Sequence, residues 1–446
     1  MSSLIITNAT LVNEGSITQS DVLIRNGRIE KIAPHISAEA ETIIDAKGKY
    51  LLPGMIDDQV HFREPGLTHK GRIVTESKAC IMGGITSFME MPNTKPPAVT
   101  RASLEDKYAM AKGNAYANYS FYLGATNDNI EEIKAIDPAN VCGVKVFMGA
   151  STGNMLVDEA KTLEGIFRES PMIIATHCEN TPTILANEAK WREQYGEQVP
   201  FNQHGIVRSR EACYASSSSA VGLAKKYDAP LHVLHITTKE ECDLFAAGDL
   251  AGKPITAEAC VHHLWFTDAD YDLLGGLIKC NPAIKTLEDR EAIRAAVRDG
   301  RIDVIATDHA PHTWDEKQQS YFGCPSGLPL VQYALPALLT LVNQGVFSIE
   351  QVVHKTSHAV AARYGMIDRG FIREGYWADL VLVDMKQPII DTPDRLAYLC
   401  GWSPFNGQEF SASISSTFVN GQLVYHNGET VHRPVGQRLA FQAQRR

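Results

Sequence analysis

The feature that most restricts the fold of this chain is a series of eight short apolar runs, many of them rich in β-branched residues. The runs are 55–61, 86–91, 118–124, 143–148, 172–177, 231–236, 255–260 and 303–308. Segments of helical length separate them, such as 104–111, 215–227 and 287–298. Strands that alternate with helices favour a parallel sheet. Eight such units predict an α/β protein built on a (β/α)8 barrel.

A doubly wound open sheet is the competing interpretation of the same alternation. Folds of that kind often carry a glycine-rich phosphate loop after the first strand. The chain has neither G-x-G-x-x-G after its first run nor a Walker A sequence. The barrel is therefore the favoured fold.

The two ends of the chain have a different pattern, with short alternating runs and tight turns such as Asn26-Gly27 and Lys47-Gly48. Similar runs return at 378–383 and 416–424. This pattern is typical of antiparallel strands, and chain ends often lie close together. We therefore expect a small β-sandwich domain made from residues 1–52 and 366–430, a barrel over 53–365, and a loosely held tail over 431–446.

Charge and composition restrict the partners and the compartment. The 446 residues include 42 Lys and Arg against 52 Asp and Glu, a formal net charge of −10. This balance argues against a nucleic-acid binder, and an anionic substrate would need local cations to hold it. The N-terminus lacks the pattern of a signal peptide, and the longest apolar stretch, 328–342, contains two prolines. Nine cysteines without a C-x-x-C motif indicate reduced thiols. We expect a cytoplasmic protein with a small-molecule substrate, no nucleic acid and no membrane.

Polar residues with metal-binding side chains fall near the ends of five runs. They are His61, Lys145, His177, His235 and Asp308. Barrel enzymes carry their chemistry at the carboxyl ends of the strands, and imidazole with carboxylate suits a divalent ion, Zn²⁺ by default. A single histidine there would be read as a core residue, but three from separate strands with an aspartate predict a metal site. His232 stands three residues before His235 on the same run, so it should point to the opposite face, and it is interpreted as structural. His262 and His263 receive no role.

Lys145 stands inside the apolar run 143–148, where a free ammonium is costly to bury. An outward-facing lysine with a snorkelling stem would explain it without chemistry. A buried neutral amine, however, can react with CO₂ to give a carbamate. That anion could bridge two metal ions.

Seven segments in order resemble the dihydroorotases of the amidohydrolase superfamily. The first, residues 57–66, resembles their H-x-H-x-R-x-P-G signature, and the others follow at 91–94, 143–148, 175–177, 234–237, 280–282 and 307–312. The likeness covers about residues 4–430. It implies an amidohydrolase barrel that interconverts N-carbamoyl-L-aspartate and L-dihydroorotate in pyrimidine biosynthesis, with metal-bound hydroxide as the nucleophile.

The resemblance also implies a role for each matching residue. His61 would bind the first metal, carbamylated Lys145 would bridge two Zn²⁺ ions, and His177 with His235 would hold the second. Asp308 would touch the first metal and serve as general base and acid. Arg63, Asn93 and His312 would bind the substrate carboxylate. Asn281 and the backbone of Ser326 and Gly327 would contact the substrate ring. Some dihydroorotases use an aspartate just after the fourth strand instead of the carbamate, but this chain has Gly149-Ala150 there.

One position departs from the family signature, because the first histidine of H-x-H is Gln59 here. An amide oxygen is a weaker ligand for zinc than imidazole. Three outcomes stay open. Gln59 coordinates weakly through oxygen, the first site is partly empty so that one ion is bound in place of two, or catalysis is lost.

Two other functions remain as alternatives. One is another cyclic amidase, such as a dihydropyrimidinase, hydantoinase or allantoinase. The other is a non-catalytic scaffold that binds a partner enzyme such as aspartate transcarbamoylase, a reading that only Gln59 favours. A homodimer is expected from what such barrels often do.

Overall fold

The computed structural model describes residues 3–149, 155–430 and 433–442, and in it all eight predicted runs form strands. The third run is divided in two by Tyr122. The strands are β6 (Met55–Val60), β7 (Ile85–Glu90), β8 (Asn118–Phe121), β9 (Leu123–Gly124), β10 (Val144–Phe147), β11 (Ile174–His177), β12 (Leu231–Val233), β13 (Ile255–Cys260) and β14 (Val304–Ala306).

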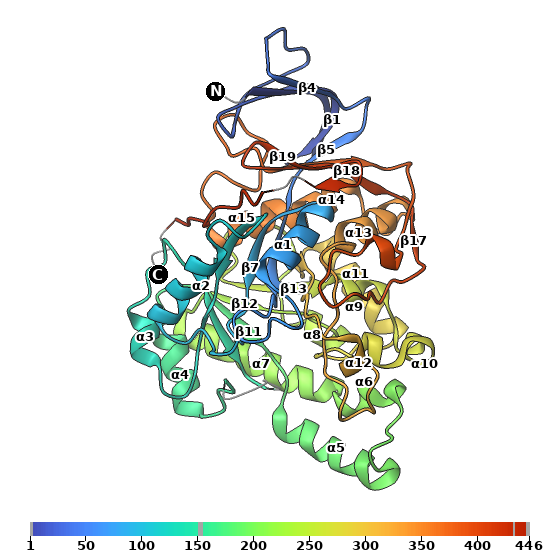
Figure 1. Cartoon of the computed structure of the whole chain (residues 1–446). Helices are drawn as coiled ribbons and strands as arrows, with labels where there is room; N and C mark the ends of the chain where they lie inside the picture. Colours follow the sequence, from blue (N-terminus) through green and yellow to red (C-terminus); the bar gives the residue numbers. More distant parts are fainter. Residues whose placement is uncertain (1–2, 150–154, 431–432, 443–446) are drawn as a thin grey trace.

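These strands are parallel and close into a barrel (Figure 1). Their ladder has the order β6-β7-β8 and then β9-β10-β11-β12-β13-β14. Between β14 and β6 the ring is completed by a parallel bridge of Val60 with His309, and the His61 N–H donates to the His309 carbonyl at 2.7 Å. A closed ring of parallel strands confirms the barrel and excludes the open sheet.

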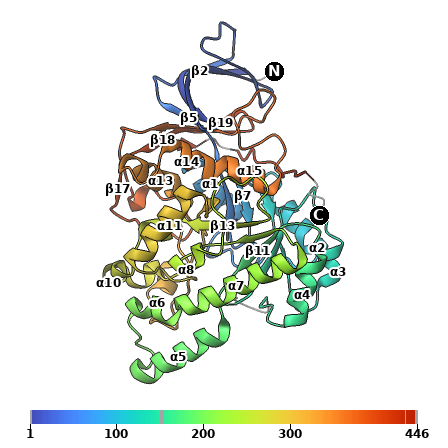
Figure 2. The same cartoon turned by 180° about the vertical axis from the view of Figure 1, so that it is seen from behind.

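Helices surround the ring, and the three predicted helical stretches lie within α2, α7 and α11 (Figure 2). The described α-helices are α1 (Ile73–Met82), α2 (Arg101–Ala111), α3 (Ile130–Lys134), α4 (Ala160–Glu169), α5 (Thr181–Tyr195), α6 (His204–Val207), α7 (Arg210–Tyr227), α8 (Lys239–Cys242), α9 (Val261–Trp265), α10 (Tyr271–Leu274), α11 (Leu287–Asp299), α12 (Trp314–Lys317), α13 (Ala334–Asn343), α14 (Ile349–Val353) and α15 (Ala359–Tyr364). The sequence fixes the ends of α11 locally, because Thr286 caps its first turn and Gly300 follows its last residue with φ 81°.

Strands from both chain ends share one nine-stranded sheet, which lies at the top of Figure 1 above the barrel. Its strands are β1 (Ser3–Asn13), β2 (Ser16–Arg25), β3 (Arg28–Ala33), β4 (Thr42–Asp45), β5 (Tyr50–Pro53), β15 (Leu380–Asp384), β18 (Ser413–Val419), β19 (Gln422–His426) and β20 (Glu429–Thr430). The antiparallel pair β5 and β15 joins the two ends. Two short strands, β16 (Ile389–Ile390) and β17 (Glu409–Phe410), pair separately. The chain ends therefore build one unit, as the sequence predicts.

The segment expected to be a loose tail is in part packed against the barrel. The Phe441 N–H donates to the Ala139 carbonyl, the Tyr119 N–H donates to the Gln437 carbonyl, and Leu439 is buried. Residues 431–432 and 443–446 lie outside the described residues. The predicted domain boundaries at 52/53 and 365/366 stay predictions.

Candidate functional site

A cavity of about 640 Å³ lies at the carboxyl ends of the barrel strands. All twelve residues to which the sequence analysis gives a site role line this cavity. They are Gln59, His61, Arg63, Asn93, Lys145, His177, His235, Asn281, Asp308, His312, Ser326 and Gly327. The fold thus brings the predicted site together, while the individual roles remain predictions.

His61, at the end of β6, is held in one orientation by Asn93. The His61 Nδ1 atom donates to the Asn93 Oδ1 atom at 2.8 Å, which leaves the lone pair on Nε2. That Nε2 atom lies 3.1 Å from the Asp308 Oδ1 atom. Burial opposes ionisation of Asp308, but the protonated form of His61, which donates to the carboxyl from Nε2, lowers its pKa below the usual value. An imidazole nitrogen and a carboxylate therefore face one point. The contact uses the amide oxygen of Asn93, so its Nδ2 group is the part that could donate to a substrate carboxylate.

His177 and His235 form the second pair, at the ends of β11 and β12. The His177 Nδ1 atom lies 3.0 Å from the His235 Nε2 atom. On its other side, His177 Nε2 donates to Glu179 at 2.8 Å, and Arg208 binds the same carboxylate. Burial alone would raise the pKa of Glu179, but Arg208 and His177 lower it to about 2. A carboxylate behind a histidine is a common arrangement in metal sites.

Lys145 lies near both pairs, since its charge acts on His61 and Asp308 of the first and on His177 of the second. Its side chain is buried, and burial lowers its pKa to about 8. The charge of Lys145 also depresses the pKa of His61 and that of His177, after the larger effect of burial. Among the described residues, the ammonium has no hydrogen bond or ion pair and lies 4.8 Å from the centre of the Phe147 ring. The outward-facing lysine considered above is therefore wrong, because β10 is an inner strand and Lys145 lines the cavity.

Three residues of the site have left-handed backbones. They are Arg63 (φ 70°), His235 (φ 40°) and Asp308 (φ 52°). Residues other than glycine rarely adopt such backbone angles, and each residue that does so costs of the order of 1–3 kcal/mol. Such strain persists where the surrounding structure enforces it, and functional sites are where it gathers.

One wall of the cavity is cationic, although the protein as a whole is acidic. Arg63 lies 3.1 Å from His312 Nε2, and Lys70 lies 3.0 Å from His312 Nδ1. Burial lowers the pKa of Arg63 to about 10, so the guanidinium keeps its charge at neutral pH. No carboxylate lies within 4.0 Å of Arg63 in the described chain, whereas Lys70 pairs with Glu316. The wall can receive an anion at Arg63.

The loop with Ser326 and Gly327 forms another wall. Gly327 has φ 146°, and a Cβ atom there would lie 2.4 Å from the Ala310 carbonyl oxygen, so glycine is required. Its N–H already donates to the Lys279 carbonyl, and its carbonyl accepts from Lys317. The Gly327 backbone therefore holds the loop, and its predicted contact with a substrate ring stays a prediction. Asn281 keeps a buried Oδ1 atom without a hydrogen bond among the described residues.

Gln59 is buried at the end of β6 with its amide at the cavity wall. In the described chain its only side-chain hydrogen bond is a weak one, from the Cys260 thiol at 3.7 Å. Ala150, part of the alternative ligand position after the fourth strand, lies outside the described residues.

Sequence reasoning missed two functional candidates, Lys70 and Glu179. Glu179 follows His177 by two residues after a strand, a spacing that can return a side chain to the same face. Lys70 carries no local signal, because it reaches His312 across 242 residues.

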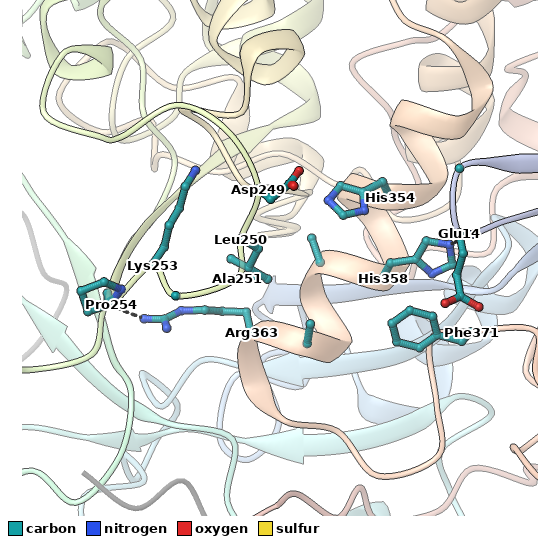
Figure 3. A pocket seen from close by; sticks show the side chains of 14 residues that line it. Glu14, Asp249, Leu250, Ala251, Lys253, Pro254, His354, His358, Arg363 and Phe371 are labelled. Atoms are coloured by element: carbon teal, nitrogen blue, oxygen red, sulfur yellow. Dashed lines mark hydrogen bonds between the residues drawn. The ribbon is translucent and has the colours of Figure 1, made fainter.

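A second cavity, of about 830 Å³, lies at the opposite, amino-terminal end of the strands (Figure 3). It is lined by the turn of β1 with β2, by the loop before β13 and by the helices around His354 and His358. None of the predicted site residues lies there.

The arrangement at the carboxyl ends fits a divalent metal centre. Two donor pairs near Lys145 present lone pairs or carboxylate oxygens, and each leading histidine is oriented by a partner behind it. None of the described helices is long and apolar enough to cross a membrane.

Comparisons with known proteins agree with this geometry. The Amidohydrolase family matches residues 50–424. The dihydroorotase of Halobacterium salinarum is 33% identical over 422 residues, which cover 92% of this chain and 96% of that protein. The dihydroorotase of Bacillus cytotoxicus is 32% identical over 421 residues, 93% of this chain and 96% of that one.

Among solved structures, an L-hydantoinase (dihydropyrimidinase) from Arthrobacter aurescens superposes with a TM-score of 0.94 at 26% identity. The match covers 99% of this chain and 100% of the other. With a family match over most of its length and relatives above 30% identity, this chain belongs to the amidohydrolase family of enzymes.

Proposed function

We propose that this enzyme is a dihydroorotase, which interconverts L-dihydroorotate and N-carbamoyl-L-aspartate as a step of pyrimidine biosynthesis. The observation that carries the proposal is the buried Arg63, charged, beside His312 and without a carboxylate partner in the described chain. Both compounds carry a carboxylate that can occupy this position. The sequence similarity to proteins named dihydroorotase supports the same substrate.

The donor set is suited to Zn²⁺, one or two ions. His61, Asp308 and Lys145 would hold one ion, with Gln59 as a weak further ligand, and His177, His235 and Lys145 the other. Lys145 would join both as a carbamate, formed when its neutral amine adds to CO₂ and releases one proton. The lowered pKa of Lys145, about 8, makes the neutral amine accessible near physiological pH. The chemistry that such ions supply is a water that ionises near neutral pH and a polarised carbonyl group.

The protein's own residues bind and orient the substrate. Arg63 can hold the substrate carboxylate with two parallel hydrogen bonds, which fixes direction as well as charge. His312 stays neutral, since burial and its cationic neighbours hold its pKa well below the usual value. The free amide oxygen of Asn281 can accept a ring N–H.

Asp308 is placed to move the proton. Its pKa is lowered, so it is ionised and can accept the proton of the attacking water. The same carboxyl returns that proton to the departing ring nitrogen as the C–N bond of the cyclic amide breaks. In the other direction Asp308 takes a proton from the carbamoyl nitrogen, and water leaves.

Hydrolysis of an uncharged cyclic amide is the second candidate, favoured by the close superposition with the L-hydantoinase. The test is a comparison of turnover with dihydroorotate, dihydrouracil, hydantoin and allantoin, after loading with zinc and bicarbonate. We expect dihydroorotate to be turned over best. Near-zero dihydroorotate turnover with good hydantoin turnover would reverse the assignment.

A protein that binds no metal and turns over none of the four compounds would favour the scaffold, including one for aspartate transcarbamoylase. The variant Gln59→His addresses that outcome. A large rise in activity would show a site damaged by Gln59, and little change a site that tolerates it.

A further inference from the structure

A cluster of three unused metal-binding side chains lies behind Gln59, outside the cavity lining. Cys260 ends β13, and His262 and His263 belong to α9. One donor atom of each lies within 4.8 Å of the others, and all three side chains are buried. None of them takes part in the reaction proposed above.

The hydrogen bonds of the cluster leave its donors free. His263 Nε2 donates to the Pro282 carbonyl at 3.1 Å, so the lone pair of this ring is on Nδ1, which has no partner among the described residues. Neither ring nitrogen of His262 has a hydrogen bond of ordinary geometry in the described chain, although the Thr307 backbone lies near the ring. Buried polar atoms are paired in most proteins, so three such nitrogens in one place indicate a missing ligand.

We propose that Cys260, His262 and His263 form a second type of metal site, a thiolate–imidazole site for Zn²⁺ or a similar thiophilic divalent ion. One sulfur and two nitrogen donors form a set that binds zinc in preference to magnesium or calcium. The backing of His263 by a carbonyl is the arrangement found behind ligating histidines. Binding removes the thiol proton of Cys260 and releases it to solvent.

Gln59 is placed to supply the fourth ligand. Its Oε1 atom lies 3.7 Å from Cys260 Sγ. Two ligands of a tetrahedral zinc ion, with bonds of about 2.3 Å to sulfur and about 2.1 Å to oxygen, are about 3.6 Å apart. The imidazoles would need to rotate inward from their present separations. The Gln59 Oε1 atom would then bind this ion, and the first ion of the cavity would be held by His61, Asp308 and Lys145 without it.

The surrounding charge favours a cation there. Glu258 accepts from the Cys260 thiol at 3.4 Å, and Asp308 is close enough to raise the pKa of that thiol after the larger effect of burial. Negatively charged carboxylates repel a bare thiolate, but they attract a metal cation that is bound to the thiolate.

The test is cobalt titration of the full-length, reduced protein after removal of metals with a chelator. Co²⁺ bound to a thiolate has an intense near-ultraviolet charge-transfer band that nitrogen and oxygen ligands lack. We expect wild type to show this band, and Cys260→Ser to lose it together with one Co²⁺ per chain. Cys280→Ser is the matched control, because Cys280 Sγ lies 3.8 Å from His263 Nε2, the atom that faces the Pro282 carbonyl, and should keep the band.

X-ray absorption of the zinc-loaded wild type tests the same site without any substitution. We expect a sulfur shell at about 2.3 Å. A wild type without the cobalt band, a band kept in Cys260→Ser, or a zinc shell of nitrogen and oxygen only would overturn the proposal. Dihydroorotate turnover is measured on the same samples to keep the two proposals apart. Turnover by a protein whose metal has no sulfur ligand would overturn the thiolate site and leave the proposed function standing.

Discussion

The barrel holds two large cavities, one at each end of its strands, and they differ in chemistry more than in size. The cavity at the amino ends is the larger, about 830 Å³ against about 640 Å³. Its basic side chains already have partners. Lys253 donates to the carbonyls of Gly248 and Gly300 and to Asp303. Arg363 donates to the Pro254 carbonyl, and His358 Nε2 accepts from the Glu14 N–H (Figure 3).

At the carboxyl ends the charged groups are held in place but not satisfied. Arg63 and Lys145 are buried there without a carboxylate within ion-pair distance in the described chain. Volume alone would therefore point to the wrong end of the barrel. Unpaired buried charges and metal-binding donors locate the site, because such groups are expensive to keep unless a ligand uses them.

The most direct test of the difference between the two cavities is to replace one lysine in each of them. We expect Lys145→Ala to lose at least one metal ion per chain by elemental analysis, and dihydroorotate turnover to fall below detection, because the bridging anion is gone. Lys253→Ala should keep its metal and turnover and lose about 1.5–3 kcal/mol of stability in denaturant unfolding, the range for hydrogen bonds to a charged group. Unchanged metal content in Lys145→Ala would count against the carbamate.

Arg63→Gln should separate substrate binding from the metal centre. The loss of a charge-assisted contact worth about 1.5–3 kcal/mol predicts a KM for dihydroorotate that is about 10- to 150-fold higher. Metal content should not change. The control is hydantoin, a cyclic amide without a carboxylate, for which any measurable KM should stay the same. An equal rise for both compounds would show that Arg63 acts on the fold of the site instead.

Glu179→Gln should have a smaller effect, on the metal rather than on the substrate. Glutamine keeps the shape of Glu179 but not the charge behind His177, and such changes lower metal affinity by about 10-fold or somewhat more. Competition with a chelator measures this. Glu240→Gln is a control on the protein surface, where the carboxylate pairs with Arg210; its metal affinity should equal that of wild type.

The last expected effect belongs to the amino-end cavity and concerns stability, not metal binding or turnover. Burial, followed by the nearby charge of Lys355, lowers the pKa of His354 from 6.5 to about 4. Its contribution to stability is therefore complete above pH 6.5 and is lost as the pH falls toward 4, where the unfolded chain has taken up the proton first. His354→Asn should lose less stability than wild type over this interval, as measured by unfolding at several pH values. Identical pH profiles would show that His354 does not titrate in this way.

Local sequence patterns carried most of the fold and much of the site. Each of the eight predicted runs contains a barrel strand, since apolar runs of strand length separated by helical segments have few other solutions. His61, Lys145, His177, His235 and Asp308 could be selected because the carboxyl ends of parallel strands meet at one rim. The metal-binding and proton-transfer roles of these residues are inferred from the chemistry of their side chains, and the structure adds the distances between them.

Contacts between distant segments were outside the reach of the sequence. His232, expected on the face opposite to His235, lies inside the barrel, where its Nδ1 atom is 2.8 Å from Thr256 Oγ1 and its Nε2 atom is 3.3 Å from Asp58. The reason is that β12 ends at Val233, and the left-handed backbone of His235 breaks the alternation of faces. The two-residue alternation of side chains along a strand cannot predict where such a break occurs.

The sequence by itself determined a barrel with a metal-binding rim, because side-chain alternation and helix length are local properties. The tertiary structure alone decided that Lys70 meets His312 and that Gln59 faces Cys260. Each of these pairs is joined by closure of the ring, which brings strands and loops together across some 200 or more residues. The register and tilt of a closed sheet are collective quantities, set by the packing of all the strands together and not by any one segment.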